Sequence, residues 1–200
     1  MLALVILSTI MLSISRILIA QISRSKSFGE NYGKWISEND KKLKFGDEIL
    51  SFASLLFSIY ITMFISHEIQ HFSFITAIIV VSLIYCNIAW IGIVFIIGNI
   101  IYPVNGIETV KNDRLSVSVL QVYSRMHFSE LALGLLTISL AYTSSIELIK
   151  YMGCIVGILQ MISTYYSQPI KYKFYIFSII LWNIWIVFFQ LTNTFIIQLF

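Results

Sequence analysis

Apolar residues occur in six blocks that are separated by shorter polar stretches. A helix needs roughly 20 apolar residues to cross about 30 Å of hydrocarbon, so blocks of this length predict membrane-spanning helices. We therefore expect an all-α, polytopic integral membrane bundle of about six transmembrane helices. Five is the alternative if the fourth and fifth blocks form one interrupted hairpin. The blocks cover approximately residues 1–22, 50–65, 74–104, 130–146, 151–167 and 174–200.

Three longer polar stretches connect these blocks at about 23–49, 104–129 and 168–173. The first contains apolar positions from Lys34 onward that predict a short interfacial helix. The second mixes periodicities and is expected to be a short amphipathic helix or a loop. Residues 1–200 are expected to form one membrane-embedded domain, because only 12% of the residues are charged and the mean hydropathy is +0.86.

The positive charges indicate how the chain is threaded. Eleven of the 13 lysines and arginines lie in the three polar connections, Lys150 lies in an opposite turn, and Arg16 lies within the first block. Lysine and arginine accumulate on the cytoplasmic side of membrane proteins. The three connections are therefore predicted to be cytoplasmic and both termini extracytoplasmic. Arg16 is close to the end of its segment and is expected to snorkel toward the interface.

The turn between the second and third blocks contains His67-Glu68-Ile69-Gln70-His71. This H-E-x-x-H spacing resembles that of zinc peptidases over these five residues only. In that class the two histidines bind zinc from one helical face, and the glutamate polarises the metal-bound water. The resemblance implies His67 and His71 as metal ligands and Glu68 as the catalytic residue.

A zinc site also needs a third protein ligand. Asn105, Glu108 and Glu130 are expected at the opposite side of the membrane from His67, so the threading excludes them. Glu147 is the acidic residue predicted on the same face. The metal hypothesis therefore consists of His67, His71 and Glu147. The alternative is that these polar residues only form a hydrated turn.

Two further patterns concern helix packing. Asn183, Gln190, Thr194 and Gln198 share one face of the last segment. This polar stripe should point into the bundle, either as hydrogen-bonding contacts between helices or as the lining of a polar pathway. Gly153 and Gly157 form a G-x-x-x-G spacing that allows close helix approach. Cys86 and Cys154 lie in apolar blocks and are not expected to form a disulfide.

These observations favour a non-catalytic subunit of a membrane complex, or a small permease-like component, in the cell membrane. The alternative is an outward-facing membrane zinc metallopeptidase. The first interpretation needs no cofactor, and the second needs zinc. We expect lipid and other membrane subunits, or further copies of the chain, as partners. A net charge of +3 without clustered basic residues argues against nucleic-acid binding.

Overall fold

The computed structural model describes residues 2–24, 31–68, 73–102, 112–163 and 172–197. Nearly all of these residues are helical, which confirms the predicted all-α class. The helices are α1 (Leu2–Ile22), α2 (Tyr32–Glu68), α3 (Phe74–Ile101), α4 (Asn112–Tyr142), α5 (Glu147–Ser163) and α6 (Tyr172–Ile197).

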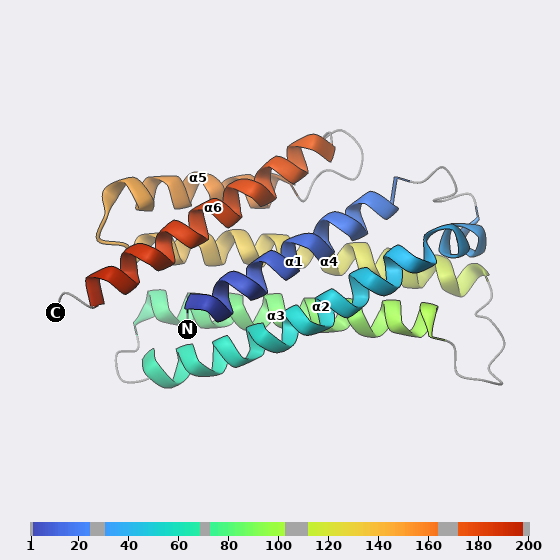
Figure 1. Cartoon of the computed structure of the whole chain (residues 1–200), viewed down its shortest axis with the longest axis horizontal. Helices are drawn as coiled ribbons and strands as arrows, with labels where there is room; N and C mark the ends of the chain where they lie inside the picture. Colours follow the sequence, from blue (N-terminus) through green and yellow to red (C-terminus); the bar gives the residue numbers. More distant parts are fainter. Residues whose placement is uncertain (1, 25–30, 69–72, 103–111, 164–171, 198–200) are drawn as a thin grey trace.

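The six helices lie along one long axis and form a closed ring (Figure 1). Each helix packs against the next along the chain, α6 packs against α1, and α2 also contacts α4. The start of α1 and the end of α6 lie at the same end of the bundle (Figure 1). This up-and-down order agrees with a chain that reverses direction at every connection.

Four helices are long and apolar enough to cross a membrane. They are α1, α2, α3 and α6. The remaining two differ: α5 has only 17 residues, and α4 contains Arg114, Arg125 and Glu130. The structure thus supports an integral helical membrane protein, while the crossing of all six helices stays a prediction.

Two predicted boundaries are wrong. The expected interfacial helix and the second span are one continuous helix, α2, of 37 residues. A short amphipathic helix was one of the two alternatives for 104–129, but the helix that begins there at Asn112 is continuous with the fourth apolar block and forms α4. Its buried positions follow a helical spacing that includes Leu115, Val119 and Val122. Val117 and Leu120, which lie between these buried positions, are exposed.

The longer α4 changes the depth of Glu130. This residue was expected at the start of a helix, at the cytoplasmic side. It actually follows Asn112 by 18 residues, which corresponds to about 27 Å along an α-helix. Glu130 therefore lies well inside the bundle.

Polar side chains connect neighbouring helices at several depths. The Oγ of Ser15 in α1 donates to the carbonyl of Gly46 in α2, at 2.8 Å. The amide of Asn87 in α3 donates to the Oγ of Ser58 in α2, at 2.7 Å. The indole N–H of Trp185 in α6 donates to the backbone oxygen of Ile149 in α5. Such bonds replace those that lipid cannot supply.

Close contact between α4 and α5 depends on glycine. A Cβ added at Gly157 would lie 2.6 Å from Ile138 and 2.7 Å from the backbone oxygen of Gly134. A Cβ at Gly153 would lie 2.4 Å from that of Ala141. The predicted G-x-x-x-G packing is thereby confirmed, with both glycines facing α4.

Gly157→Ala should lower the free energy of unfolding by about 1–3 kcal/mol, because the added methyl group overpacks the α4–α5 interface. Gly98→Ala is the matched control, since a Cβ there would meet nothing within 4 Å. The control should be neutral or stabilising by up to about 1 kcal/mol. Thermal unfolding of detergent-purified protein measures both, and equal effects would refute the close packing.

Candidate functional site

The centre of the bundle contains a buried ion pair between α1 and α4. The Nε of Arg16 donates to Oε1 of Glu130 at 2.7 Å, and its Nη2 donates to Oε2. The two side chains are only 3% and 2% exposed. A bidentate guanidinium–carboxylate pair of this kind is the strongest charged contact available to side chains.

Two further residues complete what we call the central polar cluster: Arg16, Glu130, Gln160 and Tyr175. The Nη2 of Arg16 also donates to Oε1 of Gln160 in α5, at 2.6 Å. The hydroxyl of Tyr175 in α6 donates to Oε1 of Glu130, at 2.8 Å. Both residues are fully buried. The cluster therefore joins α1, α4, α5 and α6.

Polar and aromatic neighbours fix the members of the cluster. The amide nitrogen of Gln160 donates to the backbone oxygen of Ser178, at 2.8 Å, so its oxygen is turned toward Arg16. The guanidinium carbon lies 5.9 Å from the ring centre of Tyr175 and 5.7 Å from that of Trp182. The indole N–H of Trp182 donates to Oγ1 of Thr137 in α4. Aromatic rings at these distances attract the cation.

The expectation that Arg16 snorkels is wrong. Its position six residues before the end of α1 would allow its side chain to reach the interface. Because Glu130 lies deeper than predicted, a carboxylate is available to the guanidinium inside the bundle. The pair is neutral as a whole, which removes most of the penalty for a single charge in lipid.

One part of the arginine has no partner. The Nη1 of Arg16 is buried and makes no hydrogen bond to any side chain or backbone group in the described part of the chain. A buried N–H group without an acceptor is unfavourable. Arg16, the only cation of the central polar cluster, thus has N–H groups that can donate further hydrogen bonds.

Two members of the polar stripe of α6, Asn183 and Gln190, have described side chains, and Asn183 contacts α1. The Nδ2 of Asn183 donates to the Oγ of Ser13, at 2.7 Å, and to the carbonyl of Ile179. Gln190 is buried. These positions agree with a role in helix packing. The side chain of Thr194, and Gln198 as a whole, lie outside the described residues.

The metal hypothesis is untested. The backbone of α2 includes His67 and ends at Glu68, but the side chains of both lie outside the described part, as does the whole of His71. Glu147 is exposed at the start of α5. The end of α2 and the start of α5 are at the same end of the bundle but on its opposite sides (Figure 1). Among described residues there is no group of three potential metal ligands.

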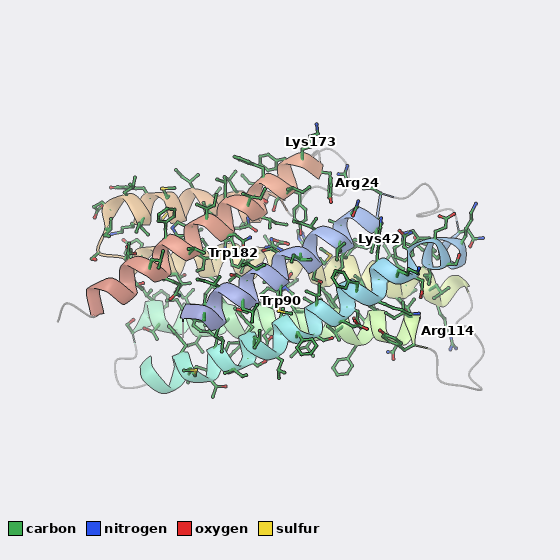
Figure 2. The ribbon with its side chains drawn as sticks, viewed as in Figure 1. Arg24, Lys42, Trp90, Arg114, Lys173 and Trp182 are labelled. Carbon is green, nitrogen blue, oxygen red and sulfur yellow. The ribbon has the colours of Figure 1, made fainter. Side chains whose placement is uncertain are left out.

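The basic side chains gather away from the chain termini. Figure 2 shows Arg24, Lys42, Arg114 and Lys173 in the half of the bundle opposite the start of α1 and the end of α6. Arg24 lies over the ring of Tyr172, 4.9 Å from its centre. The lysines and arginines of the polar connections that Figure 2 labels therefore gather at one end of the folded bundle.

Comparison with protein-family models, with curated proteins and with solved structures finds no match. The class of protein therefore rests on the fold and on the four candidate spans. Both fit a multi-pass helical membrane protein.

Removing one charge of the ion pair should cost more than removing both. Glu130→Gln or Arg16→Gln leaves one buried charge and should destabilise the protein by about 3–5 kcal/mol. The double variant restores neutrality and should recover most of that loss. Thermal unfolding in detergent measures the coupling, and strictly additive effects would show that the two charges do not interact.

Proposed function

We propose that the chain is a small permease-like component of the cell membrane, in which the central polar cluster binds the transported solute. The observation that supports this function is the buried Arg16–Glu130 pair. Ionisable groups inside membrane proteins are rare, and they commonly mark substrate or ion pathways.

The stability of the fold does not by itself explain why the chain carries a buried ion pair. Replacing a buried ion pair with well-packed apolar residues of similar volume is often neutral or stabilising. The bundle already has extensive apolar contacts, including large buried residues such as Trp90, Trp185 and Leu12. The charges are therefore better explained by a function that needs them than by the packing of the helices.

The position of the cluster suits a carrier. Its members come from two pairs of neighbouring helices, α1 with α6 and α4 with α5, so a relative movement of these pairs would open the cluster. Within each pair the contacts are local, such as Asn183 with Ser13 and Gly157 with Ile138. Rigid-body movement of helix pairs around a central site is the usual basis of alternating access.

Association with another membrane protein is a second candidate, and one face of α4 favours it. Gln121, Ser124 and Arg125 are exposed further along the first half of this helix. Polar residues at membrane depth are unfavourable against lipid. A second chain, or another copy of this one, would cover them. Co-purification in mild detergent separates a stable complex from a single chain.

We also propose that the basic end of the bundle faces the cytoplasm, in accordance with the distribution of lysine and arginine. Both termini would then be extracytoplasmic. Reporters fused after Lys42 and after His71 should give cytoplasmic and extracytoplasmic signals, respectively. The reverse pattern would refute this orientation.

Transport is tested with purified protein reconstituted into liposomes and a panel of labelled carboxylates, cations, amino acids and sugars. At least one solute should enter about ten times faster than into empty liposomes. The Arg16→Gln/Glu130→Gln double variant should lose this flux and remain folded, because it keeps the cluster neutral but removes its charges. Glu38→Gln is the control, since Glu38 is exposed at the surface, where it pairs with Lys34. Equal flux through wild type and the double variant would refute the proposed function.

A further inference from the structure

Hydrogen-bond acceptors fully use one edge of the Arg16 guanidinium and only partly use another. Glu130 takes the edge formed by Nε and Nη2. On the other edge, Nη2 donates to Gln160 while Nη1 has no partner in the described part of the chain. A guanidinium carries five N–H groups, and the contacts described here use three. The Nη1–Nη2 edge can therefore donate to a second planar oxyanion.

The surroundings of this edge hold the guanidinium in a fixed, buried position. Arg16 is only 3% exposed, and the rings of Tyr175 and Trp182 lie within 6 Å of its guanidinium carbon. Gln160 offers its amide oxygen to Nη2, and its amide nitrogen is held by the backbone oxygen of Ser178. A ligand that bonds to both Nη atoms would have to displace this amide oxygen. A carboxylate has the planar, two-oxygen geometry that a guanidinium edge binds best.

Charge balance determines what must accompany such a ligand. The Arg16–Glu130 pair is neutral, so a bound monoanion alone would leave a net negative charge in the bundle, which is strongly unfavourable. One proton on Glu130 restores neutrality. From the geometry we infer that the cluster binds one small carboxylate together with one proton, which is carried on Glu130. This inference rests on the proposed permease function and specifies its substrate class.

The groups around Glu130 are compatible with this step. Arg16 faces it from α1 and Tyr175 from α6. From α3, the thiol of Cys86 contacts the backbone oxygen of Ser129, the preceding residue. On α4 itself the nearest titratable residue in sequence is His127, and Gln160 of α5 does not titrate. No described contact joins Glu130 to α2.

Tyr175 can form a hydrogen bond with Glu130 whether that side chain is ionised or protonated. In the structure its hydroxyl donates to Oε1 of the carboxylate. A hydroxyl also accepts hydrogen bonds, so the contact can persist after Glu130 takes up the proton. The proton is bound from solution when the carboxylate ligand binds, and it is released when the ligand leaves.

The test uses the full-length protein in liposomes with labelled formate, lactate and benzoate as probes. With the outside more acidic than the inside, initial uptake of at least one of them should be several-fold faster into liposomes that contain the wild-type protein than into empty liposomes. This excess uptake should collapse when a protonophore removes the pH gradient, and it should not respond to membrane potential. Empty liposomes correct for diffusion of the neutral acids.

Glu130→Gln separates coupling from binding. This variant carries no exchangeable proton, so it should still exchange labelled for unlabelled carboxylate faster than empty liposomes do. It should not show acid-driven net uptake above that of empty liposomes. Glu130→Asp retains a carboxyl group and should retain some acid-driven uptake, which guards against misfolding of the glutamine variant. Glu38→Gln should behave as wild type.

Infrared difference spectroscopy of the wild-type protein gives an independent result. Adding formate should convert one carboxylate into a carboxylic acid, and this band should be absent in Glu130→Gln. If a carboxylate is transported without a proton, or if only cations or neutral solutes are transported, the inference is wrong and the permease function stands. If no solute shows flux that depends on Arg16 and Glu130, the proposed function itself is wrong.

Discussion

The contact between Arg16 and Glu130 is the constraint on which the arrangement of the bundle depends. Each charge alone would be strongly unfavourable inside a membrane, so neither helix can place its charge there without the other. Gln160 and Tyr175 extend the requirement to α5 and α6. A single pair of side chains thus relates helices that are distant in the sequence.

Close packing makes that contact attainable. Gly134 and Gly157 allow α4 and α5 to approach, which brings Gln160 within reach of Arg16. Hydrogen bonds such as that between Asn183 and Ser13 hold α6 against α1. The apolar outer surface needs no comparable precision, because lipid can follow its shape. Specific structure in this chain is therefore concentrated in the interior.

The sequence predicted the features that follow from regular patterns. Long apolar blocks revealed the helices, basic connections revealed which helix ends lie together, and Gly153 and Gly157 revealed a close contact. The ion pair was missed because its two halves are 114 residues apart and because the start of α4 was placed too late. A single arginine and a single glutamate within apolar or amphipathic segments were the available signal. Arg16 and Glu130 can be recognised as partners only when Glu130 is placed inside the bundle. That placement requires knowing that α4 begins within the polar stretch at 104–129. The H-E-x-x-H spacing, in contrast, remains a prediction, because the side chains it involves lie outside the described residues.

A distance measurement between labelled side chains tests the central contact most directly. Among the described ion pairs, only that of Arg16 with Glu130 joins an arginine to a glutamate, since the other pairs involve lysine. Solid-state NMR on membrane-embedded protein with ¹⁵N-arginine and carboxyl-¹³C-glutamate should therefore report one short nitrogen–carbon distance, consistent with direct hydrogen bonding. The signal should disappear in Arg16→Gln. Absence of any such short distance in the wild-type protein would contradict the buried ion pair and the functions inferred from it.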